Sequence, residues 1–332
     1  MKNKRLIATL LILFLLVIFA IAFKKDRLTK DMKDQKVIRV GILQLVTHQA
    51  LDQIEKGIED ELKASLPADK KVKISLMNAE GDQSKLQTMS RQLVSSGNDI
   101  VVGIATPAAQ GLAAASKDIP VVMSAVSDPI GAKLVTNLKK PEANVTGLSN
   151  KLPLKQTLDL IKDLTPTVKT IGLLYASNED NSLLQVNDFA KLAEARGYVI
   201  KKYAVPSTNE VSSTMSAMTK QVDAIFIPQD NTIASAFATV VSSSKAAKVP
   251  LYSSVDTMVK EGSVASISQS QYQLGVETGK QIKELMKGKK VSQVPVKVID
   301  EGKAVINEKV VNELQLSISD SLAKKSTIIR KK

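Results

Sequence analysis

The sequence predicts an α/β protein with two similar lobes, each built on a parallel sheet. Strand-like apolar runs alternate with amphipathic helical patterns along most of the chain, which is typical of strand–helix–strand units. The strand-like runs are almost continuous in isoleucine, valine and leucine, as expected for strands that are buried on both faces. The length of 332 residues is enough for about two domains, each with a core of its own.

The first lobe is expected to begin with four strands that alternate with three helices. The strands are predicted at Val37–Leu43, Val72–Met77, Asp99–Ala105 and Val121–Ala125, the last running on to Val126. The helices between them are predicted at Gln49–Ser65, Gln83–Ser96 and Pro107–Ser116. A threonine in the capping position and a proline in the first helical position are a favourable start for the third helix.

The second lobe is predicted from a recurrence of the same strand motifs about 130 residues later. Three pairs of segments match: Gly41–Gln44 with Gly172–Tyr175, Asp99–Val102 with Asp223–Phe226, and Pro120–Ser124 with Pro250–Ser254. These matches indicate a structural duplication, although parallel α/β units also resemble one another in general. The segment Asn144–Leu152, with turn-forming residues in and near it, is the expected crossing point between the lobes.

The composition excludes several classes of function. The chain has no cysteine and one histidine, so disulfides, thiol catalysis, zinc–cysteine sites, iron–sulfur clusters and two-histidine metal sites are impossible. We therefore expect neither a metal nor a cofactor. The sequence also has no Gly-x-Ser-x-Gly elbow and no Gly-rich phosphate loop, which argues against an enzyme.

The net charge of +13 is concentrated at the two ends of the chain. Residues 1–36 carry +6 and residues 321–332 carry +5, whereas the segment between them carries only +2. A nucleic-acid-binding protein is expected to gather its charge on one folded face, so nucleic acid is not an expected partner. Attraction of the basic ends to anionic phospholipid or cell wall is the simpler explanation.

The N-terminus has the features of a membrane-targeting segment. Basic residues at positions 2, 4 and 5 precede an apolar run from Leu6 to Phe23. At about 1.5 Å per residue this run nearly spans a hydrocarbon core about 30 Å thick, which favours an uncleaved anchor over residues 6–23. Ala20-Ile21-Ala22 also fits the small-x-small pattern of a cleavable signal peptide, so both alternatives stay open. In either case we expect the remainder of the chain to be exported.

The candidate ligand site follows the carboxyl ends of the strands, where open parallel sheets bind ligands. In the first lobe the candidates, with nearby helix N-termini, suit an anion such as a carboxylate: Gln44, His48, Thr106, Ala108, Ser124 and Ser127. In the second lobe they include three acidic side chains, which suit an ammonium group: Tyr175, Asn178, Glu179, Asp230, Asn231 and Asp256. Two lobes that close on a zwitterion would use both sets, and ordinary helix capping is the competing explanation for each residue.

Several motifs resemble those of one family of ABC-transporter substrate-binding proteins. They are Gly41-Ile42-Leu43-Gln44, Ala105-Thr106-Pro107-Ala108-Ala109-Gln110, Val126-Ser127-Asp128-Pro129, Asn144-Val145-Thr146-Gly147-Leu148-Ser149 and Pro228-Gln229-Asp230-Asn231-Thr232. They occur in the family's order and spacing, and the resemblance extends from about Val37 to Ile318. It is strongest to the tryptophan- or aromatic amino-acid-binding members of Gram-positive bacteria.

The resemblance implies the type I periplasmic-binding-protein fold, with two lobes, three crossovers and a ligand trapped between the lobes. We expect lobe 1 to comprise residues 37–148 and 256–288, and lobe 2 residues 149–255 and 289–320. Residues 1–36 would be the anchor and linker, and residues 321–332 a basic tail. Many relatives carry a lipid-modified cysteine, and its absence here favours a peptide anchor.

The resemblance also implies a role for individual residues. Thr106, the amides after it and Ser127 would hold the α-carboxylate of an amino acid. Asp230 would bind the α-ammonium group, with Asn231 and Asp256 supporting it across the cleft. The mouth or the side-chain pocket would be lined by Gln44, His48, Tyr175, Asn178 and Glu179. His48 could equally be an exposed residue at a helix start, and Glu179 could equally cap the following helix.

The function implied is that of a monomeric component of an ABC importer at the extracellular face of the membrane. It would bind L-tryptophan or another aromatic amino acid and deliver it to an ABC permease. Sugar is disfavoured because the chain has no tryptophan and three of its six phenylalanines lie in the apolar N-terminal run. The alternative is an exported receptor of the same fold that signals to a membrane partner. A transcription repressor with this fold is not expected, because it would need an N-terminal helix-turn-helix motif where the apolar run lies.

Overall fold

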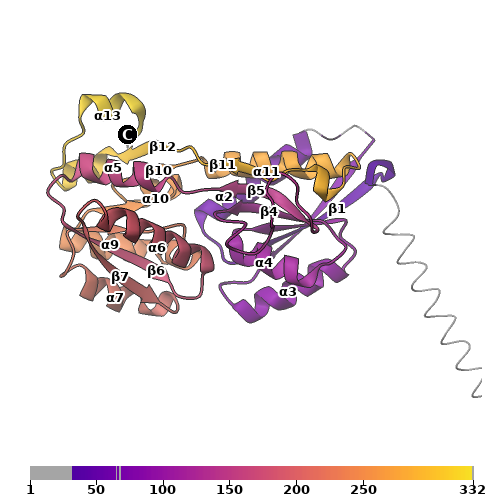
Figure 1. Ribbon diagram of the computed structural model, residues 1–332, viewed down its shortest axis with the longest axis horizontal. Helices are drawn as coiled ribbons and strands as arrows, with labels where there is room; N and C mark the ends of the chain where they lie inside the picture. Colours follow the sequence, from indigo (N-terminus) through magenta and orange to yellow (C-terminus); the bar gives the residue numbers. More distant parts are fainter. Residues whose placement is uncertain (1–31, 65, 67–68, 331–332) are drawn as a thin grey trace, which may run out of the picture.

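The computed structural model describes residues 32–64, 66 and 69–330, which fold into two α/β lobes that lie side by side (Figure 1). Each lobe is built on one sheet. The predicted membrane segment, residues 6–23, lies outside the described residues. Within the part of the chain that is described, no helix has the length and apolar character needed to cross a membrane.

Lobe 1 contains a six-stranded sheet in the order β11-β5-β4-β3-β1-β2, and its neighbouring strands are parallel. Its strands are β1 (Val37–Gln44), β2 (Lys71–Asn78), β3 (Ile100–Ile104), β4 (Val121–Val126), β5 (Val145–Asn150) and β11 (Lys297–Ile299). Its helices are η1 (Met32–Asp34), α2 (Gln49–Ala64), α3 (Gln83–Ser95), α4 (Thr106–Ala115), α11 (Gln271–Met286) and η3 (Val291–Gln293). The first four strands and three helices predicted from the sequence are confirmed to within one or two residues.

The lobe 1 sheet is buried on both faces. In β1, Ile38, Val40 and Ile42 pack with α2 and α11, whereas Leu43 packs in the cluster on the other face, with α3 and α4. Fully burying such a side chain is worth about 1.5–3 kcal/mol. Two apolar faces require apolar residues at successive positions, which explains why the strands read as continuous apolar runs.

Lobe 2 contains a seven-stranded sheet in the order β13-β12-β10-β9-β8-β6-β7, in which only β10 and β12 pair antiparallel. Its strands are β6 (Thr170–Ala176), β7 (Val199–Val205), β8 (Ala224–Phe226), β9 (Leu251–Ser253), β10 (Ala265–Ser268), β12 (Lys303–Asn307) and β13 (Ser326–Ile329). Its helices are α5 (Leu154–Leu164), α6 (Asp180–Glu194), η2 (Thr208–Glu210), α7 (Val211–Met218), α8 (Asn231–Ser235), α9 (Phe237–Ala247), α10 (Asp256–Glu261), α12 (Glu308–Glu313) and α13 (Asp320–Lys325).

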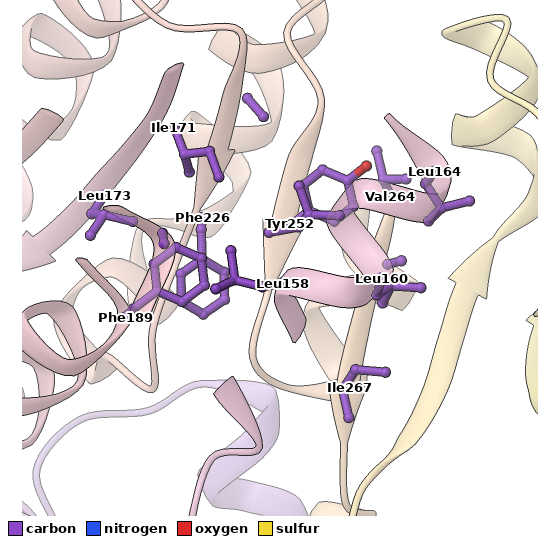
Figure 2. Close-up of a cluster of buried hydrophobic side chains, with 14 of the residues drawn as sticks. Leu158, Leu160, Leu164, Ile171, Leu173, Phe189, Phe226, Tyr252, Val264 and Ile267 are labelled. Atoms are coloured by element: carbon purple, nitrogen blue, oxygen red, sulfur yellow. The ribbon is translucent and has the colours of Figure 1, made fainter. Parts of the chain in front are cut away.

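The largest side chains of lobe 2 are part of its core. Figure 2 shows the cluster on one face of the sheet, where Phe189 of α6 stacks on Phe226 of β8 with ring centroids 4.4 Å apart. Tyr252 of β9 is buried in the same cluster, and its hydroxyl lies 2.9 Å from the hydroxyl of Thr165. These aromatic residues therefore stabilise the lobe and are not available to a ligand.

The two lobes share one strand arrangement. The order β5-β4-β3-β1-β2 in lobe 1 corresponds to β10-β9-β8-β6-β7 in lobe 2. An aspartate before the third strand makes the same contact in both lobes: Asp99 Oδ2 accepts a hydrogen bond from the backbone N–H of Arg39, and Asp223 Oδ2 accepts one from that of Thr170. The recurrence of strand motifs in the sequence therefore reflects a repeated architecture.

The chain crosses between the lobes three times, after β5, before α11 and after β11, as expected. The expected lobe boundaries are wrong at two places. Residues 256–268 belong to lobe 2, because α10 packs on β10 and β10 pairs with β9. Residues 291–299 belong to lobe 1, because β11 pairs with β5. Short strands late in the chain return to both sheets, which local patterning did not indicate.

The expected basic tail is folded as far as Arg330. α13 leads into β13, which pairs in parallel with β12 and forms an edge of the lobe 2 sheet. Arg330 Nε lies 3.2 Å from Glu308 Oε1. The prediction of a separate tail over residues 321–332 is therefore wrong for its described part, because Thr327, Ile328 and Ile329 favour a strand despite the charges around them.

Candidate functional site

A cleft between the two lobes is the candidate ligand site. Including its part open to solvent, the cleft measures about 480 Å³. The lobe 1 elements and the N-terminus of α11 contribute His48, Ala50, Leu51, Ile54, Ala105, Thr106, Ala125, Ser127, Asn150 and Gln271. Lobe 2 contributes Asn181, Gln229, Asp230, Asn231, Ala234, Val255 and Met258.

The lobe 1 wall is formed by the ends of β3 and β4. Ala105 is the residue before α4, with φ 68° and ψ 167°, a conformation that residues with a side chain rarely adopt. Ala125, in β4, also has a positive φ of 57°. Both alanines line the cleft, so two of the six described non-glycine residues with a positive φ lie at strand ends that face it. Thr106 was expected to be the N-cap of α4. It is instead the first residue of the helix, and Ala105 is the N-cap.

The backbone N–H groups of the first turn of α4 point out of the helix at this wall. First-turn N–H groups have no acceptor within a helix, and Pro107 has no N–H. The N–H groups of Thr106 and Ala108 are thus the ones that could bind an anion, together with the side chain of Ser127. The methyl group of Ala108 does not line the cleft, because it is fully buried where α4 passes close to Gly103 of β3.

The lobe 2 wall contains the buried carboxylate of Asp230, which is 3% exposed. Its Oδ2 accepts a hydrogen bond of 2.6 Å from the N–H of Ala176, and its Oδ1 accepts one of 2.8 Å from the N–H of Ile233. Asp230 thereby joins the end of β6 to the start of α8. It also lines the cleft, as predicted.

Glu179 is buried behind this wall and does not line the cleft. Its Oε1 accepts hydrogen bonds of 2.8 Å from both the N–H and the hydroxyl of Thr232. Its Oε2 accepts bonds from the N–H of Asn231, at 3.1 Å, and from Nδ2 of Asn231, at 2.6 Å. Glu179 therefore caps α8. The expectation that it would cap the following helix, α6, is wrong, because its side chain makes no capping bond there.

Asp230, in the lobe 2 wall, and Glu179, behind it, are buried acids without a cationic partner among the described residues. Neither Asp230 nor Glu179 forms a salt bridge with a lysine, arginine or histidine in the described part of the chain. Burial, and then the negative charge of Glu179, raise the pKa of Asp230 to about 7. A cationic group bound in the cleft would remove this penalty.

His48 links the two lobes through Asn231. Its Nε2 lies 3.3 Å from Oδ1 of Asn231. Because Nδ2 of Asn231 donates to the Glu179 carboxylate, Oδ1 must face His48, and Nε2 of His48 must carry the proton. Burial lowers the pKa of His48 to about 4, so the ring is neutral at pH 7. His48 lies just before α2, half-buried, and lines the cleft.

A second link joins the lobes at the edge of the cleft. Gln110 Nε2 of α4 donates to Asp180 Oδ2 of α6 over 3.1 Å. An added Cβ on Gly131 of lobe 1 would lie 3.2 Å from Leu184 of lobe 2, so the surfaces also touch here. The lobes are therefore closed on one another in this structure.

Two predicted residues of lobe 1 point into the lobe instead of the cleft. Gln44 is buried at the end of β1, where its Oε1 accepts a hydrogen bond of 3.4 Å from Asn78. The hydroxyl of Ser124 in β4 lies 2.7 Å from that of Thr278 in α11. Gln44 ends β1 and Ser124 lies two residues before the end of β4, and the alternation of side chains along a strand directs both away from the ligand site.

Three predicted residues of lobe 2 also do not line the cleft. Tyr175 packs against the core cluster of Figure 2, and Asn178 is exposed. Asp256 faces Lys260 on its own helix at 3.5 Å and lies in lobe 2, so it cannot support Asp230 from across the cleft. Of the twelve predicted residues, the structure brings together His48, Thr106, Ser127, Asp230 and Asn231.

The sequence prediction missed four polar residues that line the cleft. Asn150 and Gln271 lie next to the crossovers between lobes, where local patterns give no sign of a site. Gln229 lies within the Pro228–Thr232 motif and Asn181 lies two residues after Glu179, so the strand-end rule indicated their position but not their orientation. Among the residues that the structure describes, no group of three or more His, Asp or Glu side chains could hold a metal ion.

Comparisons with known proteins agree with this architecture. The family model for ABC transporter substrate binding proteins matches residues 39–329. A crystal structure of an ABC domain in complex with L-Trp from Streptococcus pneumoniae is 54% identical, with a TM-score of 0.85 and coverage of 88% of this chain and 99% of that one. A tyrosine-binding protein from Clostridioides difficile (strain R20291) is 35% identical over 287 residues, which are 86% of this chain and 83% of that protein.

A third relative is in a different state. The ligand-free, open structure of a substrate-binding protein with adhesive properties from Clostridium difficile is 30% identical, with a TM-score of 0.66 and coverage of 89% of this chain and 100% of that one. The higher TM-score against the L-Trp complex is in keeping with the hydrogen bonds that join the lobes here.

The repeated lobes, the three crossovers and the cleft at the strand ends define a two-lobed α/β protein with a cleft between its lobes. The family model matches this chain over most of its length, which makes the assignment to a class of protein more specific. The chain belongs to the family of ABC transporter substrate-binding proteins, as its motifs indicated.

Proposed function

We propose that this protein is the substrate-binding component of an ABC importer and that it binds an aromatic amino acid, L-tryptophan, between its lobes. The observation that carries the proposal is the buried Asp230 carboxylate, which lines the cleft and has no cationic partner among the described residues. A buried carboxylate is costly unless it is paired. The α-ammonium group of an amino acid would supply the missing partner.

The opposite wall suits the α-carboxylate of the same ligand. The first turn of α4, with Thr106, offers N–H groups and the positive end of a helix dipole, and Ser127 offers a hydroxyl nearby. An amino acid would thus meet an anion-binding group on lobe 1 and a carboxylate on lobe 2. Contacts to both lobes favour the closed arrangement over the open one.

The remainder of the cleft is aliphatic. Leu51, Ile54, Val255 and Met258 line it, and a flat apolar ring could pack against these side chains. Methionine sulfur also makes favourable contacts with aromatic rings. The L-Trp complex of the 54%-identical relative supports tryptophan as the ligand, and the tyrosine-binding relative supports the wider class of aromatic amino acids.

We further propose that the protein acts at the extracellular face of the membrane as a monomer. The apolar run over residues 6–23 supports export, as an anchor or as a signal peptide. The family supports an ABC permease as the partner, which would receive the ligand from the closed form. An anchor would keep the protein close to this permease.

A titration with L-tryptophan tests the proposed ligand. The protein has no tryptophan, so excitation beyond tyrosine absorption reports the indole ring of the ligand alone. We expect a saturable blue shift that other aromatic amino acids reverse by competition and that sugars do not affect. If the emission does not change at any protein concentration, and tyrosine and phenylalanine also leave the melting temperature unchanged, an aromatic ligand is ruled out.

A further inference from the structure

Three residues that line the cleft each have one buried side-chain polar atom without a hydrogen-bond partner. These atoms are Oδ1 of Asn150, Oδ1 of Asn181 and Nε2 of Gln229. A buried polar group without a partner is energetically costly, so such groups are rare unless something else binds them. Asn181 and Gln229 lie together on the lobe 2 wall, beside Asp230.

The orientation of the Gln229 amide is fixed by Gln185 of α6. The backbone N–H of Gln229 can only donate, and it donates to Oε1 of Gln185 over 2.9 Å. Nε2 of Gln185 therefore points at the Gln229 side chain and donates to its Oε1 over 2.7 Å. With its oxygen used in this way, Gln229 must present its NH₂ group as the unpartnered one.

The orientation of the Asn181 amide is fixed by a similar argument. Its Nδ2 donates over 2.7 Å to the backbone carbonyl of Gln229, which can only accept. Its Oδ1 is therefore the free atom, and Asn181 is only 5% exposed. The lobe 2 wall thus offers one fixed donor and one fixed acceptor next to the Asp230 carboxylate.

We propose that this amide pair, Asn181 and Gln229, recognises the zwitterionic head group of the ligand through hydrogen bonds. The inference rests on the proposed function. In tryptophan the carboxylate oxygens are the only hydrogen-bond acceptors, because the indole N–H is a donor. Gln229 Nε2 therefore binds a carboxylate oxygen, while Asn181 Oδ1 shares the α-ammonium group with Asp230. Gln185 is a positioning residue that selects the donor face of Gln229.

In this arrangement lobe 2 binds both the carboxylate and the ammonium group of the ligand. The α-carboxylate has two oxygens, so one can face Gln229 while the other faces the first turn of α4 in lobe 1. The carboxylate would then connect the two lobes directly. Amines without a carboxylate would lose that connection, which makes the amide pair a determinant of selectivity for amino acids.

The first test replaces the donor. Gln229→Met keeps the length of the side chain and removes the NH₂ group, and we expect it to weaken L-tryptophan binding about 10- to 100-fold, because hydrogen bonds to charged groups are among the strongest. The affinity for tryptamine, which has no carboxylate, should change by less than about threefold. Gln53→Met, on the exposed face of α2, is the matched control and should alter neither affinity.

The second test reverses the positioning contact. In Gln185→Glu the new carboxylate has no NH₂ group to offer, so the Gln229 amide should rotate and present its oxygen to the cleft. L-tryptophan binding should then weaken, whereas tryptamine binding should stay the same or become tighter. A purely structural role for Gln185 would weaken both ligands equally. Thermal unfolding of each variant with calorimetric titration of both ligands gives the comparison.

The outcomes separate this proposal from the proposed function. Suppose that the wild-type protein binds L-tryptophan. If Gln229→Met then leaves the affinity for L-tryptophan unchanged, or weakens the affinity for tryptamine equally, the amide pair does not bind the carboxylate. Should Gln229→Met fail to fold, Gln185→Glu decides by the same comparison of ligands. If the wild-type protein binds no aromatic amino acid at all, the proposed function itself is wrong.

Discussion

Asp230 combines two roles in one side chain. Its oxygens accept hydrogen bonds from Ala176 and Ile233, which hold β6 and α8 together, and its charge remains without a protein cation. A residue that is satisfied in hydrogen bonding but not in charge is well suited to bind an ammonium group. The structure can tolerate it without ligand because its pKa is raised, so that a proton can neutralise it.

Substitution of Asp230 should weaken the ligand far more than substitution of a neighbouring acid. Asp230→Asn keeps the size and one acceptor oxygen, and we expect it to cost about 2–5 kcal/mol of binding free energy, because the ammonium group loses a desolvated partner. Asp256→Asn is the matched control in the same lobe, where the carboxylate faces Lys260 outside the cleft. Calorimetric titration measures both, and equal affinities in the two variants would show that Asp230 does not bind the ammonium group.

The raised pKa of Asp230 predicts a pH dependence of ligand stabilisation. Between the ordinary pKa of the unfolded chain and about 7, the ligand-free protein holds a proton that the unfolded chain has lost, so its stability falls as the pH rises through this window. A bound ammonium group lowers the pKa and removes that loss. The ligand-induced rise in melting temperature should therefore be larger at pH 8 than at pH 5.5. In Asp230→Asn the rise should not depend on pH in this range.

At the scale of elements, the sequence predicts the first four strands and three helices of lobe 1 and the repeat of three strand motifs in lobe 2. β1 to β4 and the helices between them lie within one or two residues of their predicted positions, because strands buried on both faces leave a clear apolar signal. Strands β5, β7, β10, β11, β12 and β13 were not predicted, and for β11 and β13 the reason is that three or four residues at a sheet edge leave almost no apolar signal. Long-range pairing decides which sheet such strands join.

The candidate site is predictable in position but not in detail. The strand-end rule indicated both walls of the cleft, and it found Thr106, Ser127 and Asp230. It could not show that Ser124 faces α11 instead of the cleft, because a shift of one residue turns a strand side chain to the other face. Nor could it find Asn150, which lines the cleft only because β5 ends at a crossover.

The contact between α2 and α11 depends on glycines. A Cβ on Gly275 of α11 would lie 2.0 Å from the backbone carbonyl oxygen of Ile54 in α2, so the helices meet backbone to backbone. We expect Gly275→Ala to destabilise the protein by at least about 2 kcal/mol, as overpacking against backbone cannot relax locally. Gly111→Ala in α4 is the control, because its Cβ would meet only the movable Ser90 hydroxyl within 3 Å. Equal free energies of unfolding for the two variants, measured by denaturant titration, would contradict this explanation.

At the scale of the whole molecule, only a few contacts join the lobes outside the crossovers. The described hydrogen bonds between their side chains are those of His48 with Asn231 and of Gln110 with Asp180. Each is worth only about 0.5–1.5 kcal/mol, which is too little to keep the lobes closed without a ligand. Closure should therefore depend mainly on a ligand that contacts both walls of the cleft.

Ligand binding should make the protein more compact. We expect small-angle scattering to give a smaller radius of gyration with saturating L-tryptophan than without it. Gln110→Ala should leave the ligand-bound dimension unchanged, because the ligand and not this rim contact holds the lobes together. A ligand-free protein that is already as compact as the ligand-bound one would contradict closure by population shift.

The central claim is that the cleft binds an aromatic amino acid through Asp230, a buried acid that has no cationic partner among the described residues. Calorimetric titration of the wild-type protein with L-tryptophan at pH 6.5, repeated in two buffers of different ionisation enthalpy, tests it most directly. We predict saturable binding of one ligand per chain, with a difference in heat that corresponds to the release of a fraction of a proton. Binding without any proton release would contradict the raised pKa of Asp230, and the absence of binding would contradict the ligand itself.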